Sequence, residues 1–170
     1  IPKISTDRSQ RALLLSQLHA LLNRSEQEHF AIFLIKIDNF IDVEQDFGFE
    51  LGCTLISEIG AQLKLQINNQ DCLVHLQSDE FALLKTDISD AESAKRLATK
   101  IQSRFRFSFQ IETYNILCSC HIGISLQTEM NRHVNQILKD ADIALKIAEK
   151  KGRGQFHIAA TKPILATNTN

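Results

Sequence analysis

The chain has 170 residues and a mass of 19.2 kDa, which suits one domain with a hydrophobic core of its own. Hydrophobic residues make up 44% of the sequence and charged residues 23%, a composition typical of a globular domain in water. The net charge is −1 with both signs interspersed, so no extended basic field is available for a nucleic-acid backbone. We therefore expect no nucleic-acid partner.

No run of the sequence approaches the roughly 20 apolar residues of a membrane-spanning helix, and the first residues lack the order of a signal peptide. We expect a cytoplasmic segment without direct membrane contact, although the full-length protein could be anchored elsewhere. The four cysteines form no CxxC pair, which favours reduced thiols packed as small apolar residues. A polar tail over 159–170 reads as a linker, which leaves 1–158 as a single domain.

Hydrophobic spacing predicts the secondary structure. Apolar residues at helical spacing mark amphipathic helices, whereas a short continuous apolar run such as "FAIFLIKID" is typical of a strand buried on both faces. A basic stretch followed by Gly152 predicts the end of the last helix. In chain order we expect a helix over 7–22, a strand over 30–38, a helix over 51–63, strands over 72–76 and 81–85, a helix over 91–105, strands over 107–111 and 116–125, a helix over 134–148, and a short last strand over 155–159.

The strands are expected in hairpins separated by helices. One hairpin turns at Gln77–Glu80, and a second joins 107–111 to 116–125 through a short polar link. This order predicts an α+β fold with one mainly antiparallel sheet of about five strands and helices packed around it.

Four sequence motifs occur in an order typical of one family: "IDNF" at the end of the first strand, "SDEF" at the first hairpin, "HIGIS" in a late strand, and "ADIALKIAEKKGRG" in the last helix. Together they resemble the GGDEF domain of the bacterial diguanylate cyclase family, from about Arg8 to His157. The resemblance implies a palm related to nucleotidyl cyclases. It also implies that two GTP-loaded subunits make cyclic di-GMP, with divalent cations held by acidic side chains.

The resemblance places Asp79 at a metal-binding position and Glu80 beside the reacting hydroxyl, where it would also contact the nucleotide. The family's glycine pair is Gln77-Ser78 here, and its metal-binding aspartate on the first strand falls at Lys36. A protonated lysine has no lone pair to offer a cation. We expect Lys36 to lie within ion-pairing reach of Asp79 or Glu80, because a half-buried ammonium needs compensation.

The positions that bind the nucleotide also depart from the family pattern. The guanine-reading asparagine and aspartate fall at Glu44 and Cys53, and the phosphate-binding lysine falls at Glu149. Arg153 keeps its place after Gly152 and is the remaining candidate for phosphate binding. A glutamate facing phosphates repels them, so we expect weak or no GTP binding.

The family's product-inhibition motif, Arg-x-x-Asp, reads Asn68-x-x-Asp71 in this chain. Only the aspartate matches, and asparagine lacks the bidentate fork of arginine that grips a phosphate or a guanine edge. Feedback binding of cyclic di-GMP at this position is therefore not expected.

These departures predict a degenerate, catalytically inactive GGDEF domain with vestigial Asp79 and Glu80 and no cofactor. Such a domain would regulate or position a neighbouring EAL phosphodiesterase or sensor domain, and it could also form a homodimer. The alternatives are an active cyclase, which would need Mg²⁺, and a module that binds GTP as an allosteric ligand. Plain alternatives also stay open for single residues: Asp79 and Glu80 solvate a turn, and Arg153 complements the carboxyl end of the last helix.

Overall fold

The computed structural model describes residues 7–23, 29–127 and 133–160. Most of the expected linker over 159–170 lies outside the described residues, and that assignment stays a prediction. The helices and strands in chain order are α1 (Asp7–Leu22), β1 (Phe30–Ile37), α2 (Phe40–Phe47), α3 (Phe49–Lys64), β2 (Cys72–Gln77), β3 (Glu80–Thr86), α4 (Ala91–Arg104), β4 (Phe109–Ile111), β5 (Tyr114–Ile116), β6 (Cys120–Leu126), α5 (Val134–Lys150) and β7 (Phe156–Ile158).

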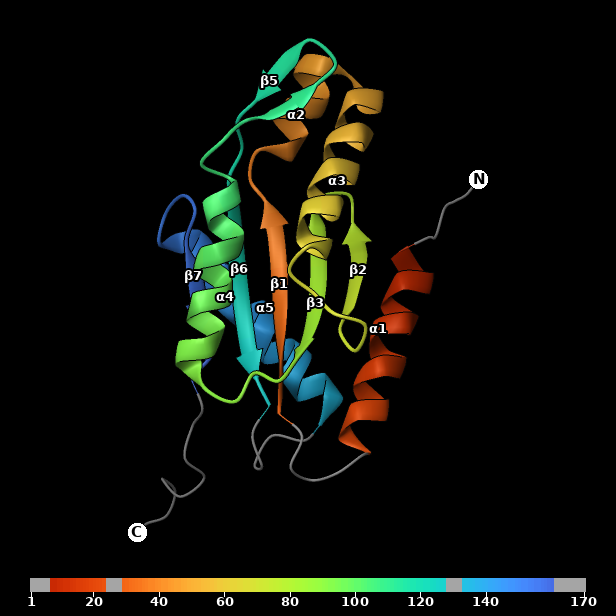
Figure 1. Ribbon diagram of the computed structural model, residues 1–170, viewed down its shortest axis with the longest axis vertical. Helices are drawn as coiled ribbons and strands as arrows, with labels where there is room; N and C mark the ends of the chain where they lie inside the picture. Colours follow the sequence, from red (N-terminus) through yellow and green to blue (C-terminus); the bar gives the residue numbers. More distant parts are fainter. Residues whose placement is uncertain (1–6, 24–28, 128–132, 161–170) are drawn as a thin grey trace.

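Five strands form the central sheet in the order β2-β3-β1-β6-β7 (Figure 1). β1 lies in the middle and pairs antiparallel with β3 and β6, and β2 pairs antiparallel with β3. The short β7 pairs parallel with β6 and corresponds to the expected last strand. The predicted α+β fold with a mainly antiparallel sheet of five strands is confirmed.

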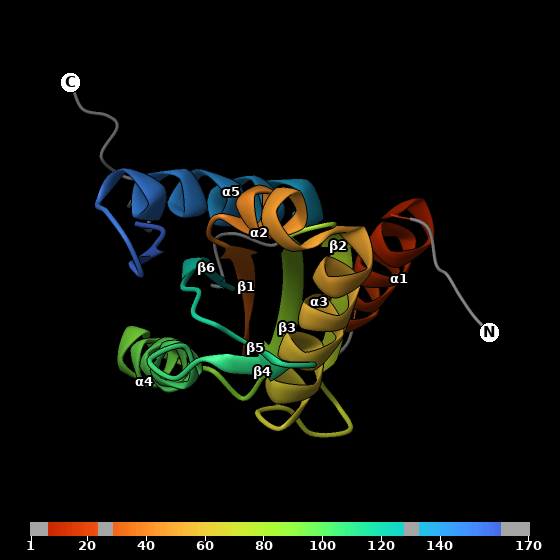
Figure 2. The same cartoon turned by 90° about the horizontal axis from the view of Figure 1, so that it is seen from above.

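Helices cover both faces of the sheet, and β1 is buried on each side. Alternate residues of β1 such as Phe33 and Ile35 join the core on the side of α3 and α4, whereas Ile32 and Leu34 join the core on the side of α1 and α5. Figure 2 shows α5 and α4 on opposite sides of the sheet. Burial on both faces explains why the sequence of β1 is continuously apolar.

α5 packs unusually close to the sheet at Gly123 in β6. A Cβ atom placed on this glycine would lie 2.3 Å from the backbone nitrogen of Leu145 and 2.4 Å from the carbonyl oxygen of Ala141. Contacts this short do not occur between real atoms, so only glycine lets the helix backbone approach the strand here. The glycine of the "HIGIS" motif thus fixes α5, and Glu149 with it, against the sheet.

Two sequence expectations differ from the structure. The predicted hairpin of 107–111 with 116–125 is wrong, because β4 pairs with β5 in a separate two-stranded sheet and β6 pairs with β1. The chain reverses at Glu112, which has a φ of 57°, and leaves the strand at Leu117, whose side chain is 67% exposed. The helix α2 was not predicted, although Phe40, Val43 and Phe47 follow helical spacing.

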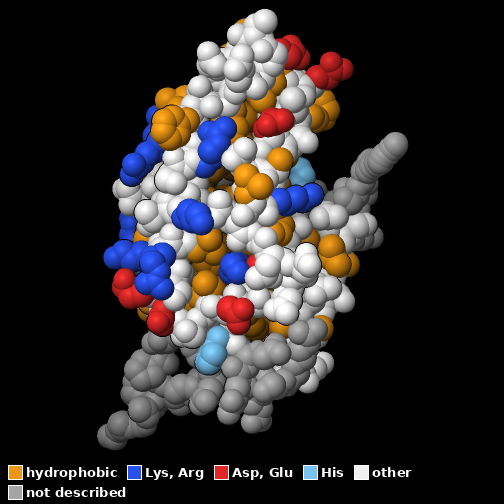
Figure 3. Space-filling model, in the orientation of Figure 1, with side chains coloured by type: hydrophobic (Ala, Val, Ile, Leu, Met, Phe, Trp, Pro, Cys, Tyr) orange, Lys and Arg blue, Asp and Glu red, His pale blue; other side chains and the backbone are white. Residues whose placement is uncertain are grey.

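Several apolar side chains reach the surface, in separate places on the face that carries α3 and α4 (Figure 3). All four cysteines are free thiols, as expected from their spacing. Within the described ranges, no helix combines the length and the apolar character that crossing a membrane requires.

Candidate functional site

The acidic pair lies at the turn between β2 and β3. Gln77 pairs with Glu80 across the hairpin, which leaves Ser78 and Asp79 as the turn residues. Neither turn residue has a positive φ, so this turn forms without glycine. The backbone N–H of Ile37 donates to the carbonyl oxygen of Asp79 at 2.8 Å, which fixes the turn at the end of β1.

Three polar residues on neighbouring strands stand side by side beneath α5. Lys36 of β1 lies directly opposite Glu80 of β3 on one side and opposite His121 of β6 on the other. Residues opposite one another in an antiparallel pair project from the same face of the sheet. This face carries the core formed with α1 and α5, so residues of those helices complete the site.

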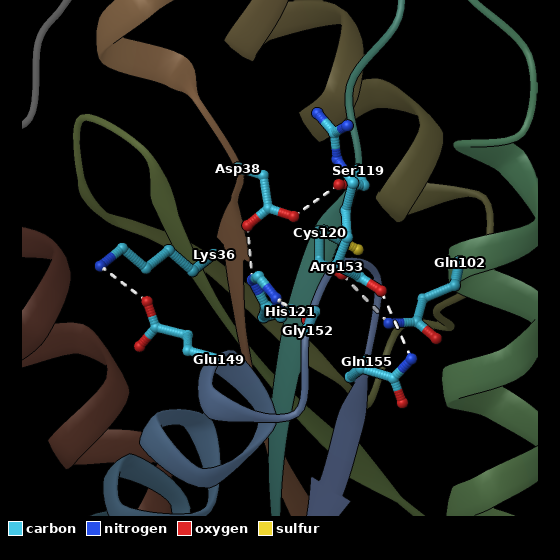
Figure 4. A network of polar contacts seen from close by, with 10 residues as sticks. All are labelled: Lys36, Asp38, Gln102, Ser119, Cys120, His121, Glu149, Gly152, Arg153 and Gln155. Atoms are coloured by element: carbon cyan, nitrogen blue, oxygen red, sulfur yellow. Dashed lines mark hydrogen bonds and ion pairs between the residues drawn. The ribbon is translucent and has the colours of Figure 1, made fainter.

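Lys36 forms its ion pair with Glu149 of α5, at 3.3 Å between Nζ and Oε2. Figure 4 shows these two side chains pointing toward one another from β1 and α5. The expected ion pair of Lys36 with Asp79 or Glu80 is therefore wrong: neither acid of the turn comes within ion-pair distance. The reason is the close packing of α5, which brings a carboxylate nearer to the ammonium than the turn does.

The two side chains of this pair are 38% and 35% exposed, so water screens their interaction. Burial lowers the pKa of Lys36, but the negative charges of Glu149, Asp79 and Glu80 outweigh it and hold the pKa above its usual value. Lys36 thus stays protonated and supplies the positive charge at the centre of this acidic group.

Glu80 is the most perturbed acid of the site. Burial, together with the negative charges of Asp142 and Asp79, raises the pKa of Glu80 to about 7, against the opposing charges of Lys36 and Arg11. A carboxyl group that keeps its proton near neutral pH is a poor metal ligand until the proton leaves. With a pKa of about 7, Glu80 is present both as the neutral acid and as the carboxylate near neutral pH, and it would have to lose its proton to bind a metal ion.

A buried network next to this site holds the turn that follows α5 (Figure 4). His121 Nδ1 lies 2.5 Å from Oδ1 of Asp38, and His121 Nε2 lies 2.6 Å from the carbonyl oxygen of Gly152. The hydroxyl of Ser119 donates to the other oxygen of Asp38. Asp38 and His121 were missed as site residues, because each belongs to a different motif and only the pairing of β1 with β6 brings them together.

Arg153 follows Gly152 in this turn and is exposed. Its carbonyl oxygen accepts a hydrogen bond from the side-chain amide of Gln155 at 3.4 Å. Gly152 has a φ of 116°, which other residues rarely adopt, so the glycine before the arginine is required by the backbone. The role of Arg153 in nucleotide binding stays a prediction.

The geometry does not fit the metal centre that the family resemblance implies. Asp79 and Glu80 share the turn, but the position across from them carries the ammonium of Lys36. Among the described residues, no three His, Cys, Asp or Glu side chains are grouped as a metal ion would need. Asp79 as a metal ligand therefore stays a prediction that this arrangement does not favour.

The positions expected to read the base do lie together. Glu44 and Cys53 line a cavity of about 660 Å³ on the side of α3, which extends to Ser78 in the turn. The aromatic rings of Phe40 and Phe49 line the same cavity. The structure thus places the altered base positions in one pocket, on the opposite face of the sheet from Lys36.

Asp71, the residue of the product-inhibition motif that this chain keeps, has a structural role. Its carboxylate accepts from the backbone N–H groups of Asn68 and Thr86, each at 2.9 Å, and from the Thr86 hydroxyl at 2.8 Å. Lys85 Nζ lies 3.0 Å from the same group, and the Asp71 side chain is not exposed. Burial raises the pKa of Asp71, but these partners outweigh burial and lower it below the usual value.

Comparison with known proteins identifies the family. The family model described as "Diguanylate cyclase, GGDEF domain" matches residues 5–155. The chain is 28% identical to the cyclic di-GMP phosphodiesterase PdeR of Escherichia coli over 81% of this chain and 21% of PdeR. It is 27% identical to the bifunctional diguanylate cyclase/cyclic di-GMP phosphodiesterase MucR of Pseudomonas aeruginosa, over 86% of this chain and 22% of MucR. The chain thus spans about a fifth of the length of these relatives.

The fold agrees with a solved structure of the same family. The GGDEF domain of TpbB from Pseudomonas aeruginosa superposes with a TM-score of 0.84 at 26% identity, covering 89% of this chain and 96% of that domain. The family model, the relatives and the fold lead to one conclusion: the chain belongs to the GGDEF family of diguanylate cyclase domains.

Proposed function

We propose that this GGDEF domain makes no cyclic di-GMP and instead regulates or positions a neighbouring domain of the same signalling protein. The observation that carries the proposal is the ion pair of Lys36 with Glu149. By the family resemblance, Lys36 stands at the position of a metal-binding aspartate and Glu149 at the position of a phosphate-binding lysine. Each residue therefore carries the charge opposite to that of the family residue. The pair therefore occupies the place where the family gathers metal and triphosphate.

The expected neighbour is an EAL phosphodiesterase or a sensor domain. PdeR carries a phosphodiesterase name, MucR carries both activities in its name, and in each the region like this chain is about a fifth of the protein. A silent domain in such a chain acts through contacts with its neighbour or with a second copy of itself. This role requires a stable fold and a suitable surface, but no catalytic metal.

Loss of several polar contacts at once predicts weak nucleotide binding. If three charged contacts of about 1.5 kcal/mol each are missing, affinity falls by about three powers of ten. A ligand bound at micromolar concentration by an intact site would then bind in the millimolar range. Millimolar GTP with magnesium would stabilise the fold by only about 0.4 kcal/mol.

The test is a sensitive assay for cyclic di-GMP made from GTP with Mg²⁺ or Mn²⁺, together with a thermal-shift titration with GTP. We expect no turnover, and less than about 2 °C of shift at millimolar GTP. Turnover that disappears in the Glu80→Ala variant would refute the proposal and support the active cyclase. A saturable shift at micromolar GTP without turnover would instead favour the allosteric GTP module.

The matched variant restores the family residues at four positions: Lys36→Asp, Glu44→Asn, Cys53→Asp and Glu149→Lys. We expect this variant to recover GTP binding more readily than turnover, because the long side chain of Gln77 still stands at the turn where glycine would leave room. A variant that gains no GTP affinity although it stays folded would show that these four positions do not explain the loss.

A further inference from the structure

We propose that the cavity beside α3 binds a small organic cation with an aromatic or apolar body, and that Glu44 is the residue that holds its positive charge. The proposal deepens the proposed function, since it rests on this pocket no longer serving GTP. It assigns a ligand class to a site whose base-reading residues have changed.

The carboxylate of Glu44 has no partner of its own. Glu44 is half-buried and lines the cavity, and among the described residues nothing donates a hydrogen bond to its side chain or forms an ion pair with it. Its backbone is fixed, because the N–H of Gly48 donates to the Glu44 carbonyl oxygen at 2.8 Å. A ligand that brings a positive N–H donor to this carboxylate would form a charge-assisted hydrogen bond with it.

Close packing against α3 places this carboxylate beside an aromatic ring. A Cβ atom on Gly52 would lie 2.9 Å from Cγ of Glu44 and 3.2 Å from Cζ of Phe40. The absence of a side chain at Gly52 therefore leaves the space in which the carboxylate and the ring meet. An ammonium next to both groups would gain an ion pair and a cation–π contact together.

Other apolar side chains complete the cavity. Phe49 is 71% exposed at its rim, and Phe81 and Leu73 belong to the sheet side of the lining. Rings and aliphatic side chains of this kind suit the body of an aromatic amine better than a triphosphate, which needs many donors. The lining thus favours a ligand whose charge is confined to one end.

The distribution of charge sets the orientation of that ligand. Lys64 is the one lysine or arginine among the residues described as lining the cavity, and it lies twelve residues beyond Gly52 on α3. At 1.5 Å per residue this is about 18 Å along the helix, too far for Lys64 to neutralise Glu44. The end of the cavity near Glu44 is therefore negative, and the cationic group of the ligand belongs there.

The experiment compares two probes with the same ring and opposite charge, tryptamine and indole-3-propionate, by calorimetry or ligand-observed NMR on the full chain. We expect tryptamine to bind at least tenfold more tightly than indole-3-propionate. Glu44→Gln should lower the affinity for tryptamine at least tenfold without lowering the affinity for indole-3-propionate. Glu58→Gln, an exposed position on α3 outside the cavity, is the matched control and should change neither.

Phe49→Ala provides a second variant, because its exposed ring can be removed with little effect on folding. We expect Phe49→Ala to lower the affinity for tryptamine, while tryptamine still binds more tightly than indole-3-propionate. Equal binding of the two probes, no detectable binding of tryptamine, or tryptamine binding that Glu44→Gln leaves unchanged would overturn the inference.

A parallel titration with GTP and magnesium separates this inference from the proposed function. GTP that binds at micromolar concentration, together with no preference for tryptamine over indole-3-propionate, would overturn both, since the pocket would still serve the nucleotide. If tryptamine shows no preference and GTP does not bind either, the organic-cation site alone is overturned.

Discussion

Neutralising Glu80 should stabilise the protein at alkaline pH. The pKa of Glu80 is raised from 4.5 to about 7, chiefly by burial and then by Asp142 and Asp79. At about 1.4 kcal/mol for each unit of pKa, that rise corresponds to about 3 kcal/mol as an upper limit. Because the side chain is partly exposed and water screens it, we expect Glu80→Gln to gain about 1–2 kcal/mol at pH 8.

The sign of the effect depends on pH. The folded state holds the proton of Glu80 more tightly than the unfolded chain does, so between pH 4.5 and about 7 the folded state binds more protons. Stability linked to Glu80 is therefore full below about pH 4.5 and falls as the pH rises through 7. The advantage of Glu80→Gln should be present at pH 8 and should nearly vanish at pH 4.5.

Urea denaturation of both proteins at pH 4.5 and pH 8 measures this difference as a change in the midpoint. Glu58→Gln, at an exposed position of α3, serves as the control. It should change the free energy of unfolding only slightly, and by the same amount at pH 4.5 and pH 8. If Glu80→Gln lowers stability at pH 8, or has the same effect at both pH values, burial does not hold the proton on Glu80 and the reasoning is wrong.

Three further predictions concern the packing and charges around the site. Asp71→Ala should cost about 3 kcal/mol by urea denaturation, because two backbone N–H groups, a hydroxyl and an ammonium lose their buried acceptor. Gly123→Ala should prevent stable folding as judged by circular dichroism, whereas Gly60→Ala, whose Cβ would meet its nearest atom at 3.4 Å, should change stability by less than about 1 kcal/mol. Lys36→Glu and Glu149→Lys should each destabilise in thermal melts by placing like charges together, and the double variant should recover at least half of the summed loss.

The central sheet could be predicted because its signals are local. The continuous apolar run of β1 is contained in a stretch of a few residues, and so is the polar turn between β2 and β3. The partner of β4 could not be assigned in the same way, since both β5 and the start of β6 follow it as apolar segments. The positive φ of Glu112 and the exposure of Leu117, which decide between them, depend on the folded chain.

The sequence identified altered positions around the candidate site, but it did not show which of them are in contact. Family motifs identified Lys36 and Glu149 as altered positions, yet the expected partner of Lys36 was an acid of the turn. The choice between these partners depends on how closely α5 approaches β6, which Gly123 sets through its missing side chain. A sequence can show that a charge needs compensation, but the distance between a helix and a sheet decides which residue supplies it.

The altered positions fall on the two faces of the sheet and meet only at the turn after β2. Lys36 lies beneath α5 and pairs with Glu149 of that helix, whereas Glu44 and Cys53 line the cavity beside α3. An intact cyclase must bring base, phosphates and metal to one nucleotide, so changes on both faces disturb a single ligand. If the nucleotide does not bind, as we propose, the two faces become independent of one another: the ion pair belongs to one layer, and the unpaired carboxylate of Glu44 to the other. Binding of a cation at Glu44 should therefore leave the pH dependence due to Glu80 unchanged, because the core of the sheet separates the two carboxylates.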